Sequence, residues 1–116
     1  MTLRSLLTFL ALCLLLAGCA AHVVEVDIVN HTNQAIRNVE VTFGGGTYGK
    51  SSIPAQSTNH NRIKIFSLAP IQVQFDDATG KHVSTTGPSL AKNAEGTLTL
   101  TIDAAGQSWS GRASAK

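Results

Sequence analysis

The stretch Thr97-Leu98-Thr99-Leu100-Thr101-Ile102 decides the fold class, because apolar residues alternate with threonine along its whole length. A two-residue period directs the apolar side chains to one face of a β-strand and the polar ones to the other. Threonine suits the solvated face of a pleated strand. We therefore expect Leu100 to be buried and its neighbour Thr99 to point to water.

Similar alternation recurs along the chain, and no helical pattern separates one such segment from the next. The segments lie at 24–28, 39–43, 62–65 and 71–75, and shorter strands are expected at 48–53, 81–85 and 107–111. Short strands at this spacing predict an all-β fold. We expect a small immunoglobulin-like two-sheet sandwich of about seven to eight antiparallel strands, with a small barrel as the alternative.

Two connections share one turn chemistry, in which an aspartate is followed by small residues and then by glycine. They are Asp77-Ala78-Thr79-Gly80-Lys81 and Asp103-Ala104-Ala105-Gly106-Gln107. The aspartate opens a type I turn, and the glycine takes a left-handed backbone conformation. Both stretches predict tight hairpins in a meander of strands. Asn30-His31-Thr32-Asn33 is expected to join the first two strands, because asparagine tolerates positive φ and bonds its own backbone.

The N-terminal segment has the layout of an export signal, with a short positive region, an apolar run over 6–16 and then small residues. The run is too short to cross a hydrocarbon core, which needs about 20 residues. It ends in Leu16-Ala17-Gly18-Cys19, which resembles the lipobox of bacterial lipoprotein precursors. The resemblance implies that residues 1–18 are removed and that Cys19 carries a diacylglyceryl thioether. The alternative is an ordinary signal peptide cut nearby, after Ala21, which would release a soluble protein.

The same resemblance implies a cellular location. Ala20 follows the cysteine, at a position where enterobacterial lipoproteins retained at the inner membrane carry aspartate. We therefore expect a lipid-anchored protein of the outer membrane that faces the periplasm. Two or three acyl chains hold a protein on a membrane for practical purposes indefinitely.

The expected organisation is a removed signal peptide over 1–18, a lipidated tether over 19–22, one sandwich domain over 23–112 and a flexible tail over 113–116. Cys13 leaves with the signal, so Cys19 has no disulfide partner and the apolar core must stabilise the fold alone. The chain has nine Lys and Arg against seven Asp and Glu, and loss of Arg4 leaves eight. So balanced a charge gives no electrostatic case for nucleic acid.

One stretch, Gly44-Gly45-Gly46-Thr47-Tyr48-Gly49-Lys50-Ser51, matches the nucleotide-binding P-loop pattern letter for letter. A P-loop leads into a helix whose N-terminal amides face the phosphates. Here Ser52, Ile53 and Pro54 follow, with no helix-forming run behind them. The export signal also sends the domain away from cytoplasmic ATP. We interpret the stretch as a glycine-rich connection between two strands and expect no nucleotide.

The histidines and acidic residues also favour structural roles. The four histidines lack the spacing of a metal site and are expected on the solvated surface, at His22, His31, His60 and His82. Asp76 and Asp77 could suggest calcium, but an acidic pair before a turn is ordinary hairpin chemistry.

Trp109 is expected in the core, with an exposed binding anchor as the alternative. Arg62 and Lys64, with Lys50 or Lys81 extending them, are interpreted as a solvated face. The sequence has no Gly-x-Ser-x-Gly elbow and no reactive cysteine. We therefore expect no enzyme, no catalytic residue, no cofactor and no metal.

Three further segments resemble small uncharacterised proteobacterial lipoproteins with immunoglobulin-like sandwiches; they are 36–45, 53–55 and 74–81. Because these segments are mostly turns, the resemblance implies a fold and no activity. We expect a non-catalytic binding or structural module that contacts an envelope protein or the cell wall. The alternative is an inhibitor or accessory subunit of an envelope machine, such as a hydrolase inhibitor or a secretion-system lipoprotein.

Overall fold

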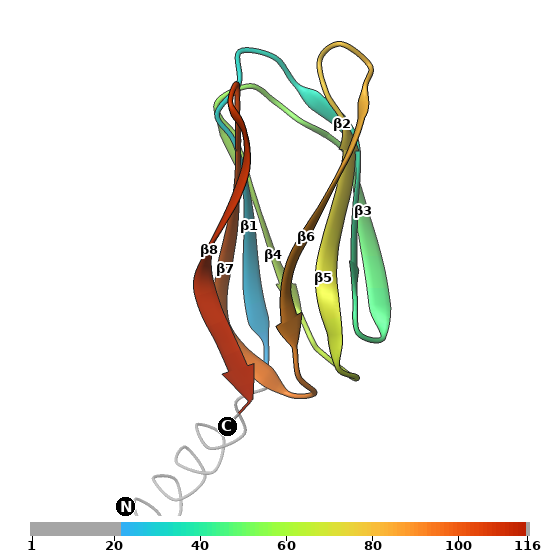
Figure 1. Cartoon of the computed structure of the whole chain (residues 1–116), viewed down its shortest axis with the longest axis vertical. Helices are drawn as coiled ribbons and strands as arrows, with labels where there is room; N and C mark the ends of the chain where they lie inside the picture. Colours follow the sequence, from blue (N-terminus) through green and yellow to red (C-terminus); the bar gives the residue numbers. More distant parts are fainter. Residues whose placement is uncertain (1–21, 116) are drawn as a thin grey trace, which may run out of the picture.

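The computed structural model describes residues 22–115, which form eight β-strands in two facing sheets of four strands each (Figure 1). The two-sheet sandwich expected from the strand spacing is confirmed, and the barrel alternative is wrong. The lipobox and Cys19 lie outside the described residues. In chain order the strands are β1 Val24–Asn30, β2 Ile36–Phe43, β3 Gly46–Ile53, β4 Ser57–Ile63, β5 Ala69–Asp76, β6 His82–Leu90, β7 Ala94–Asp103 and β8 Gly106–Ala115.

The strand orders are β4-β1-β7-β8 in one sheet and β3-β2-β5-β6 in the other. Two expectations are corrected by this topology. The strands are not all antiparallel, because β1 pairs with β7 in parallel, with Ile28 opposite Leu100. The chain is also not a simple meander, since only β2–β3, β5–β6 and β7–β8 are paired hairpins and the other connections cross between the sheets. Long-range pairings of this kind leave no local sequence signal.

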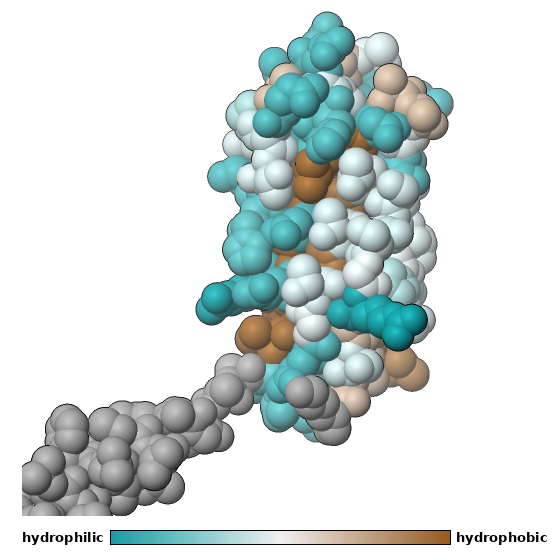
Figure 2. Space-filling view, turned by 90° about the vertical axis from the view of Figure 1, so that its left-hand side faces the viewer, coloured by the Kyte–Doolittle hydropathy of each residue, from teal (hydrophilic) through white to brown (hydrophobic). Residues whose placement is uncertain are grey.

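The core lies between the sheets and consists of the inward-facing apolar residues of the alternating segments. Leu100 is fully buried and Thr99 is partly exposed, as the alternation predicts. The outer face of the β4-β1-β7-β8 sheet is mostly hydrophilic to neutral (Figure 2). The buried apolar residues are Val24, Val26, Ile28, Ile36, Val39, Val41, Ile53, Ile63, Ile65, Ile71, Val73, Phe75, Leu90, Ala94, Leu98, Leu100 and Ile102.

The two aspartate-led turns form the tight hairpins expected of them. Asp77 Oδ1 accepts hydrogen bonds from the amides of Thr79 and Lys81, at 2.9 and 3.0 Å. Gly80 has a φ of 83°, the left-handed conformation that the turn requires. In the second hairpin Asp103 Oδ1 accepts from the Gly106 amide at 3.0 Å.

Asn30 closes β1 and is the buried polar residue of the described chain. Its Nδ2 donates to the carbonyls of Gln34, Ile53 and Pro54, at 2.9, 3.0 and 3.1 Å. Its Oδ1 accepts from the amide and hydroxyl of Thr32, at 3.0 and 2.6 Å. One side chain thus ties the β1–β2 connection to the end of β3. The hydrogen bond from the Thr32 amide to Asn30 confirms the expected bond between asparagine and its local backbone. Neither asparagine of this connection has a positive φ, which occurs instead at Asn38, Gln56 and Asn93.

Two strand boundaries differ from the sequence prediction. The strand expected at 62–65 ends at Ile63 and begins at Ser57, because β4 is an edge strand with polar residues on both faces. Strand β8 continues to Ala115, which pairs with Ala94, so the domain extends beyond residue 112 and residues 113–115 are not a frayed tail. Polar edge strands resist pairing with other chains.

Candidate functional site

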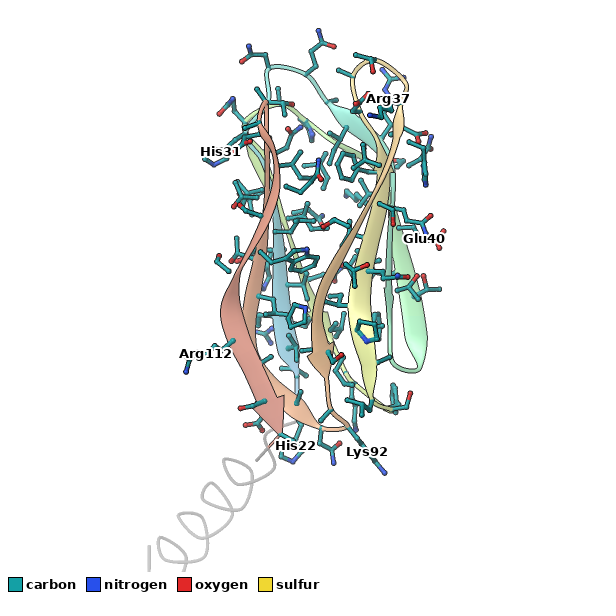
Figure 3. The ribbon with its side chains drawn as sticks, in the orientation of Figure 1. His22, His31, Arg37, Glu40, Lys92 and Arg112 are labelled. Atoms are coloured by element: carbon teal, nitrogen blue, oxygen red, sulfur yellow. The ribbon has the colours of Figure 1, made fainter. Side chains whose placement is uncertain are left out.

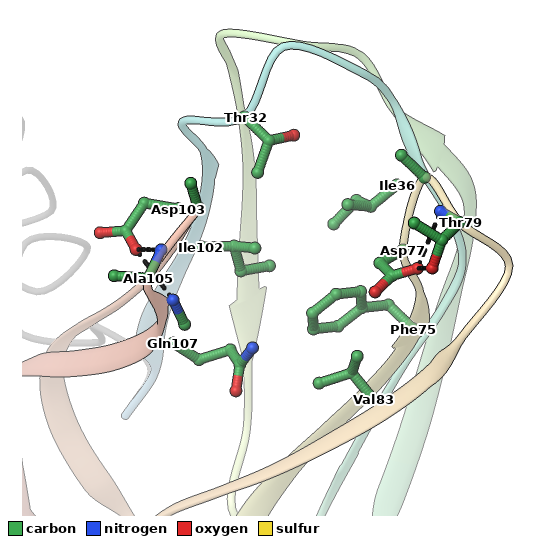
Figure 4. Close-up of a pocket in the computed structure, with 13 residues that line it drawn as sticks. Thr32, Ile36, Phe75, Asp77, Thr79, Val83, Ile102, Asp103, Ala105 and Gln107 are labelled. Carbon is green, nitrogen blue, oxygen red and sulfur yellow. Dashed lines mark hydrogen bonds between the residues drawn. The ribbon is translucent and has the colours of Figure 1, made fainter.

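A cleft opens at the end of the sandwich where β1 finishes, between the β1–β2 connection and the β5–β6 and β7–β8 hairpins (Figure 4). Its volume is about 280 Å³, close to the lower limit for a small-molecule pocket. The chain enters at the opposite end, where Figure 3 places His22, while His31 and Arg37 lie near the cleft end. The cleft and the N-terminal entry therefore lie at opposite ends of the domain.

The floor of the cleft is apolar and rigid, because it is the end of the core. Phe75 and Ile102 come from opposite sheets and point toward one another in Figure 4, and Ile36 and Val83 complete the floor. The exposed fractions of Phe75 and Ile102 are only 1% and 3%. Such a surface accepts an apolar side chain more readily than a charged group.

Polar groups form the rim of the cleft. Its two carboxylates, Asp77 and Asp103, already accept hydrogen bonds from amides of their own turns. The Thr79 hydroxyl donates to Asp77 at 2.6 Å and, with the turn amides, holds the pKa of that carboxyl below its ordinary value. Asp103 accepts from the Ala105 amide at 2.8 Å. Thr32, Thr79 and Gln107 are the uncharged polar side chains of the rim. The rim can hydrogen-bond a partner, and nothing in it resembles a paired acid and base.

A second hollow of about 560 Å³ lies on the other side of the β5–β6 hairpin and shares Asp77 and Ala78 with the cleft. Asp76 lines it and accepts a hydrogen bond from Asn38 Nδ2 at 2.9 Å. The hydrogen bond from the Asn38 amide is the main cause that lowers the pKa of Asp76. The hydrogen bond between Asp76 and the His82 ring, at 3.0 Å, is the second. The two adjacent aspartates therefore accept hydrogen bonds from different partners, and Asp77 serves the turn as hairpin chemistry predicts.

The stretch that matches the P-loop pattern is a β-hairpin, which confirms its interpretation as a connection between strands. Gly44 and Gly45 form the turn, and the following residues enter β3, where a P-loop would begin a helix. Lys50 lies opposite Val39 in the strand ladder. The geometry that cradles phosphate is replaced by strand pairing.

All four histidines are exposed, as expected from the sequence. The structure adds that three of them bond to carboxylates: His22 to Glu95, His60 to Asp27, and His82 to Asp76. Sequence analysis missed these pairs because only the strand register brings them together, as with Asp27 opposite His60. Among residues 22–115 no group of three or more His, Cys, Asp or Glu side chains could hold a metal ion.

The expected cationic face does not form one surface. Arg62 pairs with Glu25 at 3.2 Å, and Lys64 lies beyond the end of β4, with its Nζ 5.6 Å from the centre of the Phe66 ring. Lys50 and Lys81 belong to the other sheet and its hairpin. These side chains are solvated, but the strand crossing separates them.

Trp109 packs against the core, which confirms the structural interpretation. It lies opposite Leu100 in the ladder, and its Nε1 donates to Thr85 Oγ1 on β6 at 3.0 Å. The ring thereby covers the edge of the sandwich between β6 and β8. Gly87 makes room for it, since a Cβ there would lie 2.9 Å from the indole.

Tyr48 lies near the opposite edge, where the inward face of β4 carries Asn59 and Asn61. Burial raises the pKa of Tyr48 to about 12, and Asn61 near the hydroxyl opposes the shift. The Tyr48 hydroxyl is buried, and Asn61 is too poorly aligned to form a hydrogen bond with it. Asn59 Oδ1 is likewise buried without a hydrogen-bond partner. This edge is therefore polar inside and less well satisfied than the Trp109 edge.

The fold defines a small two-layer β-sandwich. No family model matches the chain, and no curated protein matches it. A solved structure, an NMR structure of a protein from Eubacterium rectale, is similar over 73% of this chain and 82% of that chain, with a TM-score of 0.55 and 13% sequence identity. At that identity the likeness concerns the fold alone. Within residues 22–115 no helix is long and apolar enough to cross a membrane.

Proposed function

We propose that this chain is a lipoprotein of the bacterial cell envelope, anchored through Cys19 to the outer membrane and acting in the periplasm as a non-catalytic binding or structural module. The observation that carries the proposal is the sequence Leu16-Ala17-Gly18-Cys19 at the end of a short apolar run. A run of this length cannot span the membrane, so acyl chains are the means of attachment.

The geometry of the sandwich supports a binding role at the end away from the anchor. The cleft between the hairpins has a buried apolar floor and a rim of turn residues, including Ala78 and Ala104. Loops carried by a rigid β-framework are common binding surfaces. The cleft suits one apolar side chain of a protein partner, with the Gln107 amide on the rim as a hydrogen-bonding group.

Processing provides the first test. Replacement of Cys19 by serine removes the sulfur that accepts lipid, so Cys19→Ser should abolish incorporation of a labelled fatty acid and leave an uncut or mislocalised precursor. Metabolic labelling and membrane fractionation measure both effects. A Cys13→Ser variant is the matched control, because that cysteine lies within the removed segment. Normal processing and fractionation of Cys19→Ser would refute the lipoprotein assignment.

Crosslinking tests the binding role and separates it from the inhibitor or accessory-subunit alternative. A photoreactive amino acid is placed at the cleft rim, at Ala78 or Ala104, and as a control at Thr86 on the outer face of β6, all exposed positions. Adducts formed only from the rim would support the cleft as the binding surface. Mass spectrometry of the adduct then distinguishes an envelope scaffold from a hydrolase or a secretion component. Adducts of equal yield at Thr86 would contradict a cleft-specific role.

A further inference from the structure

The end of the sandwich where the chain enters is a built surface of three bonded segments. The Phe66 amide donates to the Gly44 carbonyl at 2.9 Å, which joins the β4–β5 connection to the β2–β3 hairpin. The Asn93 amide donates to the Ile65 carbonyl at 3.0 Å, which adds the β6–β7 connection. Residues 64–68 are therefore held in place at this end, with Ile65 fully buried beneath them.

Two large apolar side chains project from this surface into solvent. Among residues 22–115 the exposed large hydrophobic side chains are Phe66 and Leu68, with exposed fractions of 57% and 73%. Both belong to the one short connection between β4 and β5. A small protein that stabilises itself through its core alone gains nothing from exposing them.

Positive charge accompanies the apolar pair. Lys64 and Lys92 are exposed, and neither forms a salt bridge within the described chain. Figure 3 places Lys92 at the same lower end of the domain as His22. Apolar side chains accompanied by lysines that have no salt bridge in the described chain match the two layers of a bilayer surface, where acyl chains lie beneath anionic headgroups.

The anchor would reach the same end. Val24 at the start of β1 pairs with Ile63 at the end of β4, so the chain enters directly beside the segment that carries Phe66 and Leu68. Only Ala20 and Ala21 separate Cys19 from His22. Three residue steps span at most about 11 Å, so lipid on Cys19 would confine this end to the membrane surface.

We propose that this end of the sandwich rests on the phospholipid surface, with Phe66 and Leu68 inserted among the headgroups and Lys64 and Lys92 against their phosphates. The proposal rests on the proposed lipid anchor, which supplies the high local concentration that two side chains need in order to bind. The contact fixes the orientation of the domain, so that the cleft faces away from the membrane.

The test measures the depth of position 68 in the bilayer. After processing, Cys13 is gone and the Cys19 sulfur is a thioether, so Leu68→Cys provides the one free thiol. The processed protein is labelled with an environment-sensitive nitrobenzoxadiazole fluorophore and reconstituted into vesicles of phosphatidylethanolamine and phosphatidylglycerol. Flotation and the mass of the N-terminal peptide report the anchor independently. Ala104→Cys, at the cleft end, is the matched control.

We expect a blue-shifted emission and at least twofold quenching by nitroxide-labelled lipid at position 68, with neither effect at position 104. A double variant, Lys64→Glu with Lys92→Glu, should lose at least half of the quenching, while Lys81→Glu should not change it. If the protein carries lipid and floats but the label at 68 behaves as in water, the surface contact is refuted and the anchor stands. If the peptide carries no lipid, the anchor is wrong and the contact that depends on it is rejected too.

Discussion

Replacement of Asn30 by alanine should destabilise the sandwich more than any other single polar change in the described chain. The substitution removes the donor from the Gln34, Ile53 and Pro54 carbonyls and the acceptor from Thr32. The contact with the Ile53 carbonyl is buried, and the others are partly accessible to water. A buried group left unpaired costs about 1–3 kcal/mol, and each lost bond that water can replace costs about 0.5–1 kcal/mol.

The expected loss is therefore about 3–5 kcal/mol, a large part of the roughly 5–15 kcal/mol that stabilises a domain. Urea unfolding of residues 20–116, followed by fluorescence of Trp109, measures it, because the chain has one tryptophan. Asn33→Ala is the matched control in the same connection, where the residue is exposed, and should change stability by less than about 0.5 kcal/mol.

An aspartate at position 30 sharpens the test. Asn30→Asp keeps the shape but turns a carboxylate toward carbonyl oxygens, which raises the pKa of the new side chain in the folded state. Its stability should be greatest below the unfolded pKa of about 4 and should fall as the pH rises through the folded value. If Asn30→Ala loses no more stability than Asn33→Ala, Asn30 does not tie the β1–β2 connection to the end of β3.

Three further predictions concern the core and the two edges of the sandwich. Leu100→Ala should cost about 2–5 kcal/mol in urea unfolding and Thr99→Ala less than about 1 kcal/mol; equal losses would contradict the register. The phenol of Tyr48, the one tyrosine, should titrate at about 12 by absorbance at 295 nm in the folded protein, against the ordinary value of 10.0 in urea. The stability linked to its neutral form is then complete below pH 10.0 and is lost as the pH rises toward about 12, whereas titration near 10.0 in the native state would contradict the burial. Gly87→Ala should displace Trp109, shift its fluorescence to the red and cost about 1–3 kcal/mol, and an unchanged spectrum would show that the indole does not fill this position.

The sequence predicts those parts of the fold in which one residue type alternates with another. Residues 97–102 and the aspartate-led turns form as expected because their signals are local. The alternation predicts a strand at 62–65, but β4 begins at Ser57. Residues 57–62 are polar on both faces, so they show no hydrophobic period from which the start of the strand could be predicted. The parallel pairing of β1 with β7 joins distant segments, and no local pattern encodes it.

The same distinction explains what sequence analysis missed at the candidate site. The cleft is made by two hairpins and one connection that meet only in the folded sandwich. Asn30 has the appearance of an ordinary turn residue, and only the position of the Ile53 carbonyl makes it a buried tie. The sequence does not distinguish Phe66 and Leu68 from apolar residues of the core. Their exposure follows from their position at one end of the sandwich.

The pairing of β1 with β7 also sets a time order for folding. β1 is the first strand of the domain and lies between β4 and β7, so its sheet cannot be completed until residues 94–103 are free to join it. Closing so long a loop costs entropy before the contacts form, and topologies dominated by distant contacts fold slowly. Under the proposed export, with the N-terminus crossing first, the chain would therefore remain unfolded until almost all of it has crossed. The topology would keep it threadable during transit and delay the sandwich until the last hairpin arrives.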